Sequence, residues 1–322
     1  MKTVNIAIMG FGNIGVGTYR GLEINHDAIA AKTGLDLKVA KIIELDIDRP
    51  REANPDRALF TTDRFEAFRD PSIDIVAELI GGIEPATTFM SEAMKHGKHV
   101  VTANKAALAA NYERLTGEAE EAGVLFRFEA AVGGGIPVIN AIETSLRSNQ
   151  IDEVTGILNG TTNFILTQMT RAGRSYADVL KEAQEKGFAE ADPTADVEGI
   201  DAANKLSILI SLCFGDRVKV EEIPTIGISG VTPDDIAQAK AENKVVKLLA
   251  HAAKEDGEII CSVAPARIDA NHPLAGVSDE FNAIYLKGNI LGETMFYGKG
   301  AGPLPTGGAI IGDIIDIATR TK

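Results

Sequence analysis

Short apolar runs alternate with longer helical patterns through the first 130 residues. The apolar runs predict five strands, at 4–9, 37–45, 73–80, 99–102 and 124–130. The longer patterns predict helices from about residue 14, over 85–96 and over 112–122. Because strands that alternate with helices are typical of βαβ units, this part of the chain predicts an α/β fold with a parallel sheet.

The pattern changes after Ala130. The segment Gly133-Gly134-Gly135-Ile136-Pro137 interrupts it, and Pro137 suits the first turn of a helix that runs to about Arg147. Later patterns predict helices over 161–171, from the capping box of Ser175 and Asp178, over 196–214, from Thr232 and over 308–319. Strands are predicted at 151–158, 245–251, 258–267, 283–286 and 293–297. These elements indicate a second, α+β domain with a mixed, largely antiparallel sheet.

A glycine loop joins the first predicted strand to the first helix. Gly10-Phe11-Gly12-Asn13-Ile14-Gly15 has the spacing G-x-G-x-x-G. In dinucleotide-binding folds the first glycine permits a tight turn, the second lets the backbone approach a pyrophosphate, and the third lets helix and strand pack closely. The helix N-terminus then offers N–H donors to the phosphates. The loop predicts a Rossmann-type dinucleotide-binding domain; the alternative interpretation is a plain tight turn.

Two carboxylates follow the second predicted strand, where such folds place the group that contacts the adenosine ribose. Glu44 or Asp46 would accept a hydrogen bond from a ribose 2′-hydroxyl and repel a 2′-phosphate, which favours NAD over NADP. Glu44 lies 29 residues after Gly15, farther than the roughly 20 residues that are usual. We attribute the extra residues to an extended first helix and turn around 25–34. The alternative is that these acids are simply solvated in a loop.

Charge, apolar run length and cysteine content narrow the function classes. The formal net charge of −14 argues against nucleic-acid binding, which needs a basic face. The longest apolar run, 206–214, is far shorter than the roughly 20 residues that span a bilayer. The N-terminal apolar run leads into the glycine loop without a signal-peptide cleavage site. With only Cys213 and Cys261, neither a disulfide scaffold nor a multi-cysteine zinc site is expected, so we predict a cytoplasmic protein.

A second group of polar residues lies between Gly187 and Lys205, a segment dense in acids. Asp201 and Lys205 are four residues apart and would share one face of a helix. The apolar residues that follow would place Lys205 at the mouth of a buried helix, where partial burial lowers a lysine pKa and suits proton transfer. The alternative is an ordinary surface ion pair. Lys105 follows a predicted strand at its carboxyl end, the edge where open α/β sheets bind ligands, although it could equally be solvated.

Taken together, these motifs carry a family resemblance. The chain resembles the homoserine dehydrogenases through its glycine loop and through further motifs in the family's order: Thr102-Ala103-Asn104-Lys105-Ala106, Gly133-Gly134-Gly135-Ile136-Pro137, Asn159-Gly160-Thr161-Thr162-Asn163, Glu190-Ala191-Asp192-Pro193 and Gly199-Ile200-Asp201-Ala202-Ala203-Asn204-Lys205. Each motif is unspecific alone, but the combination is highly specific and covers essentially the whole chain.

The resemblance implies reversible, NAD(P)H-dependent reduction of L-aspartate 4-semialdehyde to L-homoserine, on the route to threonine, methionine and isoleucine. It makes Lys205 the general acid that protonates the forming alkoxide, with Asp201 orienting the substrate or Lys205, and Lys105 beside nicotinamide and substrate. The implied substrate-binding residues are Glu190, Asp196, Asn159, Gly160 and Thr161. The implied cofactor contacts are Gly10, Phe11, Gly12, Asn13, Ile14, Gly15, Glu44, Thr102, Lys105, Gly187 and Gly302.

The resemblance also implies a monovalent cation, usually sodium, held by Glu129 and by the backbone carbonyls of Val132, Gly134 and Ile136. We expect residues 1–130 and about 300–322 to form the dinucleotide-binding domain, and 131–299 a substrate-binding domain through which the family is usually dimeric. Many relatives continue into a regulatory amino-acid-binding domain. Because this chain stops at Lys322, we expect that domain to be absent and threonine to inhibit little.

Two other function classes remain open on the residues alone. An aldehyde-oxidising semialdehyde dehydrogenase with a related two-domain plan needs a thiolate near the nicotinamide, and neither cysteine has a setting that would activate it. A regulator that senses NAD(H) without turnover would not need Asp201 and Lys205 beside a polar pocket. Measuring NAD(P)H oxidation with aspartate semialdehyde would distinguish these two classes from a homoserine dehydrogenase.

Overall fold

The computed structural model of the chain describes residues 1–321 and comprises two compact units. The first unit consists of Met1–Gly135 together with the chain from Ala301 onward, and the second of Ile136–Gly300. The chain therefore leaves the first unit once and returns to it for its last helix.

The first unit is built on a six-stranded sheet with the strand order β3-β2-β1-β4-β5-β6, in which neighbouring strands run parallel. Its strands are β1 (Lys2–Met9), β2 (Leu35–Ile43), β3 (Phe60–Thr61), β4 (Ile75–Glu78), β5 (His99–Thr102) and β6 (Phe126–Arg127). Its helices are α1 (Asn13–Thr33), α2 (Arg64–Phe68), α3 (Ala86–Lys95), α4 (Lys105–Ala122) and α10 (Pro303–Arg320). This is the strand order of the doubly wound dinucleotide-binding fold, so the expected fold class is confirmed.

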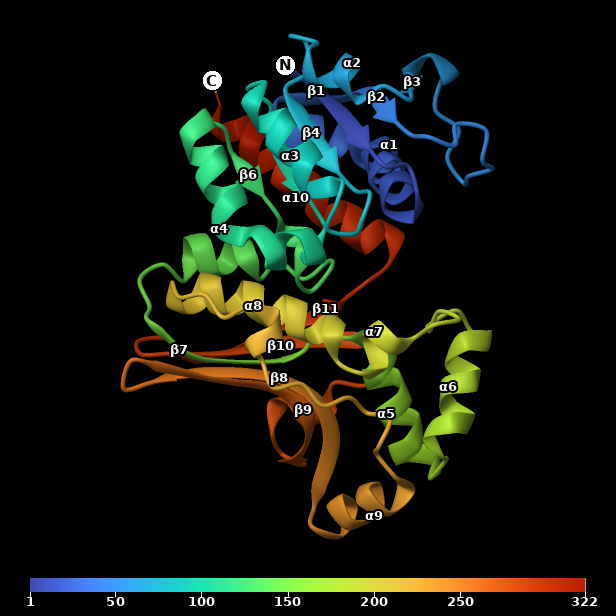
Figure 1. Cartoon of the computed structure of the whole chain (residues 1–322), viewed down its shortest axis with the longest axis vertical. Helices are drawn as coiled ribbons and strands as arrows, with labels where there is room; N and C mark the ends of the chain where they lie inside the picture. The colour runs from blue at the N-terminus through green and yellow to red at the C-terminus, as the bar shows by residue number, and fades with distance from the viewer. Residues whose placement is uncertain (322) are drawn as a thin grey trace. The chain divides into compact units, whose positions relative to one another are not determined.

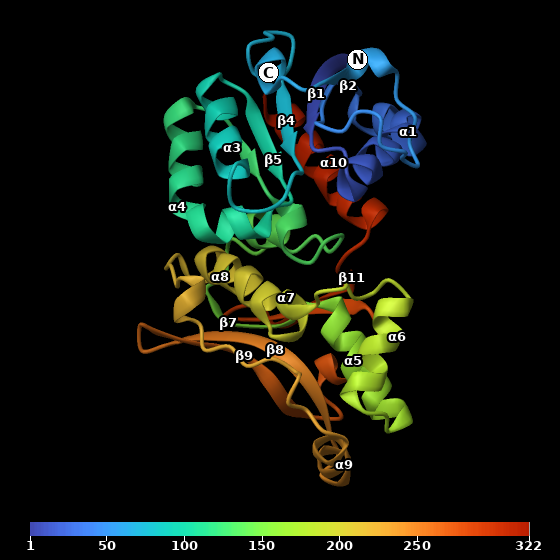
Figure 2. The same cartoon turned by 45° about the vertical axis from the view of Figure 1, so that its right-hand side comes forward.

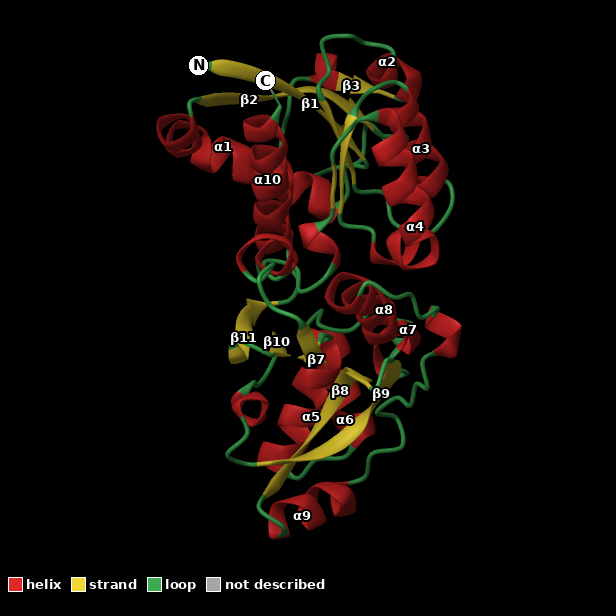
Figure 3. Ribbon diagram, turned by 90° about the vertical axis from the view of Figure 1, so that its left-hand side faces the viewer, coloured by secondary structure: helices red, strands yellow, loops and turns green. Residues whose placement is uncertain are grey.

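Helices cover both faces of this sheet. In Figure 3, α1 and α10 lie together on one side of the strands, and α3 and α4 lie together on the other. The core on the α10 side joins strand residues such as Ile6 and Ile8 to Ile310, Ile314 and Ile317 of α10. The red C-terminal helix therefore lies against the blue N-terminal helix in Figure 1, although they are separated by most of the chain.

The second unit contains a five-stranded sheet with the order β11-β10-β7-β8-β9. Its strands are β7 (Ile151–Ile157), β8 (Lys244–Glu255), β9 (Glu258–Asp269), β10 (Phe281–Gly288) and β11 (Gly292–Lys299). Its helices are α5 (Gly160–Ala172), α6 (Tyr176–Glu185), α7 (Thr194–Val197), α8 (Ile200–Phe214) and α9 (Pro233–Ala241). The named strands all pair antiparallel, and one isolated bridge, between Thr225 and Val263, is parallel. Helices α5 and α8 pack against this sheet (Figure 2).

The sequence analysis did not predict β3 or α2, and α10 begins five residues before the predicted position 308. Four further differences have a visible structural cause. The helix α4 begins at Lys105, where the Asn104 side chain accepts the Ala107 N–H and caps it. It bends at Asn111, whose φ of −131° is not helical, so the helix expected over 112–122 is the second part of α4. The fifth strand, β6, is only two residues long, since the backbone turns at Phe128 into a 3-10 helix, Glu129–Ala131. No α-helix starts at Pro137; a short π-helical turn, Ala141–Ser145, takes its place.

The fourth difference bears on the site. The single helix expected over 196–214 is two helices, α7 and α8, because Gly199 adopts a left-handed φ of 82° between them. Asp196 therefore lies on a different helix from Asp201 and Lys205. Among residues 1–321, none of the helices combines the length and the apolar character needed to cross a membrane.

Candidate active site

The glycine loop has the geometry that a pyrophosphate needs. Gly12 is the N-cap of α1, and no side chain caps this helix. The first N–H groups of α1 therefore have no side-chain acceptor and can donate to a phosphate. A Cβ added at Gly15 would lie 2.2 Å from the Gly10 carbonyl oxygen, whereas one at Gly12 would meet no atom within 4 Å. The third glycine is thus required by packing and the second leaves open space for a ligand. The loop fits a bound dinucleotide.

Glu44 directly follows β2 and contacts this loop. Its carboxylate accepts hydrogen bonds from the backbone N–H of Phe11 at 2.9 Å and of Asp46 at 3.1 Å. Burial raises the pKa of Glu44, but these two hydrogen bonds and the charge of Arg51 outweigh it, and the pKa lies below its ordinary value. Glu44 is therefore an ionised group at the loop, as the sequence analysis expected of a ribose contact.

Arg51 is a residue that the sequence analysis missed. Its guanidinium donates to the Phe11 carbonyl at 2.8 Å and lies 3.4 Å from the Glu44 carboxylate, and its side chain is only 7% exposed. Its other N–H groups donate to the backbone carbonyls of Asp46, Ile47 and Arg49. With these four hydrogen bonds and the ion pair, Arg51 connects the 46–51 loop to the glycine loop. A pocket of about 200 Å³ opens beside them, lined among others by Gly12, Asn13 and Arg20.

Thr102 and Lys105 lie at the carboxyl edge of the same sheet. Thr102 ends β5 and is fully buried, and its hydroxyl donates to the Glu78 carboxylate at 2.7 Å. Lys105 is the first residue of α4 and is half-buried. Gly302 caps the N-terminus of α10 with a φ of 118°. These expected cofactor residues and the glycine loop therefore belong to one unit.

The second unit brings Lys205 and Asp201 together in the interior. The Lys205 ammonium donates to the Asp201 carboxylate at 2.7 Å and to the Leu158 carbonyl at 2.6 Å. Both residues are more than nine-tenths buried. The alternative interpretation of a solvated surface pair is therefore wrong: α8 presents this pair to the end of β7, not to water.

Three further expected residues join this pair and complete what we call the lysine cluster: Asn159, Thr161, Asp196, Asp201 and Lys205. The Asn159 amide donates to Asp196 at 2.7 Å and to Asp201 at 3.0 Å. The Thr161 hydroxyl contacts the other Asp196 oxygen at 3.1 Å. Asn159 is also the N-cap of α5, which places Gly160 at the first turn of that helix. The cluster combines one ammonium, two carboxylates and several hydrogen-bond donors, the set that would hold an amino acid and supply a proton.

Glu190 and Gly187 lie outside the described contacts of this cluster. Glu190 is exposed, and its backbone carbonyl accepts a hydrogen bond from the Gln184 side chain. Gly187 follows α6 in a left-handed turn and is exposed. Glu190 and Gly187 remain predictions that rest on the resemblance.

The residues expected to hold a cation are buried. Glu129 is 5% exposed, Val132 is fully buried, and Ile136 is 2% exposed. Gly133 and Gly134 both have positive φ, so the backbone turns sharply at these two residues. Within residues 1–321, no group of three or more His, Cys, Asp or Glu side chains could hold a metal ion. A site here would therefore depend on backbone carbonyls together with Glu129, as the resemblance implies.

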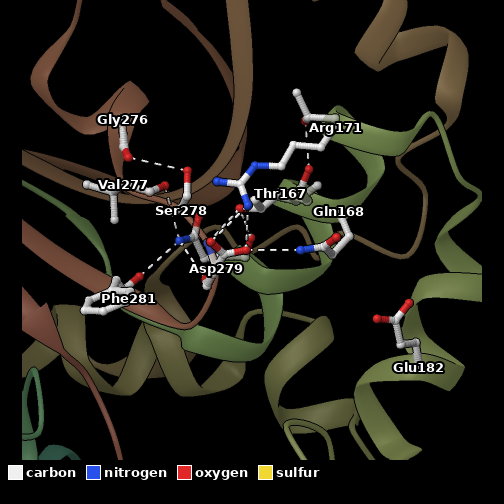
Figure 4. A network of polar contacts seen from close by, with 12 residues as sticks. Thr167, Gln168, Arg171, Glu182, Gly276, Val277, Ser278, Asp279 and Phe281 are labelled. Atoms are coloured by element: carbon white, nitrogen blue, oxygen red, sulfur yellow. Dashed lines mark hydrogen bonds and ion pairs between the residues drawn. The ribbon is translucent and has the colours of Figure 1, made fainter. Parts of the chain in front are cut away.

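Asn163, the last residue of the Asn159–Asn163 motif, points into a different network. Its amide donates to the backbone carbonyls of Asp279 and Phe281, both at 3.0 Å, and its oxygen accepts from the Lys247 ammonium. Figure 4 shows the loop around Asp279, whose carboxylate accepts hydrogen bonds from Gln168 and Arg171 of α5. Burial, and the nearby charge of Arg171, lower the pKa of Lys247 to about 8. The loop in this network packs closely against the first turn of α5, because a Cβ on Gly160 would lie 2.7 Å from the Glu280 carbonyl oxygen.

The cysteines have no activating environment. Burial raises the pKa of the Cys213 thiol to about 12, and burial also raises the pKa of Cys261. Both thiols are therefore protonated at neutral pH. This geometry opposes the thiolate mechanism that a semialdehyde dehydrogenase requires.

Comparison with known proteins identifies one protein family over nearly the whole chain. Residues 10–129 match the family model "Homoserine dehydrogenase, NAD binding domain", and residues 137–315 match "Homoserine dehydrogenase". The homoserine dehydrogenase of Bacillus subtilis is 40% identical over 322 residues, which are 100% of this chain and 74% of that protein. The crystal structure of a homoserine dehydrogenase from Thiobacillus denitrificans is 41% identical, with a TM-score of 0.93, and the match covers 99% of this chain and 74% of that one.

A hyperthermophilic archaeal homoserine dehydrogenase in complex with NADPH has the same fold. It is 28% identical with a TM-score of 0.81, and the match covers 99% of both chains. The family models and the identity over the full chain agree with the glycine loop and with the buried lysine cluster. This chain belongs to the homoserine dehydrogenase family, a family of NAD(P)-dependent oxidoreductases.

Proposed function

We propose that this protein reversibly reduces L-aspartate 4-semialdehyde to L-homoserine with a nicotinamide cofactor, in the cytoplasm, on the route to threonine, methionine and isoleucine. The observation that carries the proposal is the buried Lys205 ammonium, held between the Leu158 carbonyl and the Asp201 carboxylate. A buried, oriented proton donor is what carbonyl reduction requires of the protein. Family membership at 40% identity over the whole chain supports the same reaction.

In this proposal each group of the lysine cluster has a separate task. Lys205 donates the proton to the alkoxide oxygen, and Asp201 orients the Lys205 ammonium. Asn159 and Thr161 hold Asp196, which with Glu190 would bind the polar groups of the substrate. When bound, the cofactor supplies the hydride, so the protein has to orient the carbonyl and exclude water. Gly187 and Lys105 would contact the cofactor, and Lys105 the substrate as well.

The glycine loop, Thr102 and Gly302 would hold the cofactor, and we propose that NADH is preferred to NADPH. Glu44 places an ionised carboxylate at the end of β2, where it would accept from a ribose hydroxyl and repel a 2′-phosphate. Arg51, which lies 3.4 Å from the Glu44 carboxylate, already donates four hydrogen bonds to backbone carbonyls.

The ratio of kcat/KM for NADH and NADPH tests the cofactor preference. We expect the ratio to favour NADH in the wild type and to fall in Glu44→Gln, which removes the charge that repels a 2′-phosphate. Glu66→Gln is a matched control, because Glu66 is an exposed glutamate of α2 that pairs with Lys41 and does not line the pocket beside the glycine loop, so the ratio should stay at the wild-type value. A wild-type preference for NADPH would contradict the argument from Glu44.

Two further assignments follow from the resemblance. Glu129 and the carbonyls of Val132, Gly134 and Ile136 would bind a sodium ion, since hard oxygen ligands suit such a cation. The second unit would form a homodimer, and its edge strand β9 exposes Ile260 to solvent at 54%. Sedimentation of the purified protein tests the proposed homodimer. The proposed sodium site is tested by comparing enzyme activity in a sodium buffer with activity in a buffer whose cation is large and organic.

The assay that tests the reaction is oxidation of NAD(P)H by aspartate semialdehyde, with homoserine as the reverse substrate. We expect turnover in both directions. The variant with both Cys213→Ser and Cys261→Ser should keep its kcat, because neither thiol is ionised. Cofactor binding without turnover of either substrate would favour a regulatory sensor, and loss of kcat in the double variant would favour thiolate chemistry.

A further inference from the structure

Glu78 is a buried acid to which none of the roles above has been assigned. It is the last residue of β4 and its exposed fraction is 0%. Strand β4 lies between β1, which leads into the glycine loop, and β5, which ends in Thr102. Glu78 therefore sits at the carboxyl edge of the sheet, where the two halves of the fold meet and where ligands bind. A buried carboxylate is costly unless its partners compensate it.

The partners of Glu78 are all hydrogen-bond donors. One carboxylate oxygen accepts the Ile80 N–H at 2.8 Å, and the other accepts the Thr102 hydroxyl at 2.7 Å. The Gly81 N–H and the Asn104 side chain also hydrogen-bond to it. Both oxygens are thus engaged as acceptors, and these hydrogen bonds partly offset the burial, which raises the pKa of Glu78 above its ordinary value.

The segment that follows Glu78 lies directly against the glycine loop. The Leu79 N–H donates to the Met9 carbonyl at 2.7 Å, and a Cβ on Gly10 would lie 2.8 Å from the Leu79 carbonyl oxygen. By accepting the Ile80 N–H, Glu78 fixes this segment where it backs the first glycine of the loop.

The other side of the carboxylate fixes the start of α4. The Thr102 hydroxyl that donates to Glu78 also accepts the Asn104 N–H at 2.9 Å. The Asn104 amide donates to the Gly82 carbonyl at 2.7 Å, and its oxygen caps α4 at the Ala107 N–H. Lys105 lies between these anchors as the first residue of α4.

We propose that Glu78 is a positioning residue for the nicotinamide end of the cofactor site: its carboxylate joins the backbone behind the glycine loop to Thr102 and Asn104, and through Asn104 it sets the first turn of α4, which carries Lys105. The proposal rests on the proposed function for its effect on turnover, but its effect on cofactor binding is independent of the substrate. Of the groups that would bind the adenosine diphosphate, Glu78 supports the glycine loop only through the segment behind Gly10, whereas it bonds directly to Thr102 and supports the start of α4.

Glu78→Gln tests this at constant size. The amide has one acceptor end, so either its NH₂ group faces the Ile80 N–H or it faces the Thr102 hydroxyl, which must then turn its proton away. Each orientation leaves one donor without its acceptor: the Ile80 N–H in the first and the Thr102 hydroxyl proton in the second. An unmatched buried donor of this kind costs as much as a lost hydrogen bond, and small displacements of positioned groups reduce turnover severely.

The experiment compares wild type, Glu78→Gln and Glu66→Gln, an exposed glutamate of α2 that pairs only with Lys41 in the described contacts. Binding of NADH and of ADP-ribose, which lacks the nicotinamide, is measured by calorimetry, and kcat by semialdehyde-dependent oxidation of NADH. For Glu78→Gln we expect the Kd of ADP-ribose to rise no more than about threefold, because only the support behind Gly10 weakens, and the Kd of NADH to rise about tenfold or more. We expect kcat to fall about 10- to 100-fold. Glu66→Gln should match the wild type in all three.

Equal weakening of ADP-ribose and NADH would show that Glu78 supports the whole domain and would overturn the proposal, as would unchanged values for all three. If Glu78→Gln does not fold, Asn104→Ser keeps an N-cap for α4 but removes the amide that reaches Gly82 and Glu78. It should raise the Kd of NADH and spare that of ADP-ribose, and an unchanged Kd of NADH would overturn the proposal. If the wild type binds NADH but reduces no semialdehyde, the proposed function fails while the binding comparison still tests the role of Glu78.

Discussion

At the scale of single residues, the buried charges of this protein are compensated either by a neighbour on the same helix or by the backbone of a distant loop. Asp201 and Lys205 are four residues apart, and their pairing follows from the pitch of a helix. Arg51 and Lys247 instead have partners in distant loops, such as Phe11 and Val277. Hydrogen bonds to the backbone of a remote loop leave no pattern along the chain, so sequence analysis missed both residues.

Lys247 allows a prediction of how stability depends on pH. Its pKa of about 8 in the folded protein lies below the ordinary value of 10.5. Between these values the unfolded chain binds more protons than the folded one, so the free energy of unfolding rises with pH in this window and is flat below and above it. The Lys247 contribution should amount to about 3 kcal/mol.

Urea unfolding at several pH values from 7 to 10.5 measures this contribution as a difference between variants. Wild type should gain about 3 kcal/mol relative to Lys247→Met across the window. Lys244→Met, on the same strand with an exposed lysine paired to Glu242, should follow the wild type. Parallel curves for wild type and Lys247→Met would contradict the burial argument.

At the scale of elements, periodicity located most strands and helices, and backbone capping decided their ends. Strand β5 has the predicted bounds, and the extended first helix ends at Thr33, before a left-handed Gly34, as the Glu44 spacing implied. Sequence analysis missed the early start of α4, which the Asn104 cap sets. It also continued one helix through Gly199, because a glycine in a helical pattern does not reveal its φ.

The break at Gly199 gives a prediction at this scale. A Cβ there would lie 3.0 Å from Thr225 Cγ2 and 3.1 Å from Val263 Cγ1, in addition to the strain of a left-handed backbone. We expect Gly199→Ala to lower the free energy of unfolding by about 2–3 kcal/mol, of which the backbone strain supplies about 1–2 kcal/mol. The variant should also raise the KM for the semialdehyde, because the break sets Asp196 relative to Asp201.

Gly173→Ala is the matched control for this prediction. Gly173 has a similar φ of 63° after α5, but a Cβ there meets nothing within 4 Å. It should show the strain alone, with an unchanged KM. If chemical denaturation gives the same loss for both variants, the contacts with Thr225 and Val263 do not matter and the packing argument is wrong.

At the scale of the whole molecule, the two units carry different parts of the proposed chemistry. The glycine loop, Glu44 and Thr102 belong to the first unit, and the lysine cluster belongs to the second. The change of pattern after Ala130 predicted a second domain with a different kind of sheet, because parallel and antiparallel sheets have different spacings of strands and helices. The expected return of the last helix to the first domain rested on the resemblance, through Gly302. The assignment of cation-binding carbonyls rested on resemblance alone, since backbone oxygens have no signature in a sequence.

This division gives the most direct test of the central claim, that Lys205 donates the proton. Lys205→Ala should lower kcat about 100- to 10 000-fold, the usual contribution of a general acid. The Kd of NADH should stay within about twofold, because the loop that fits the pyrophosphate belongs to the other unit. Lys181→Ala, an exposed lysine of α6, should leave both unchanged. A Lys205→Ala variant that keeps its kcat while losing NADH binding would contradict the account.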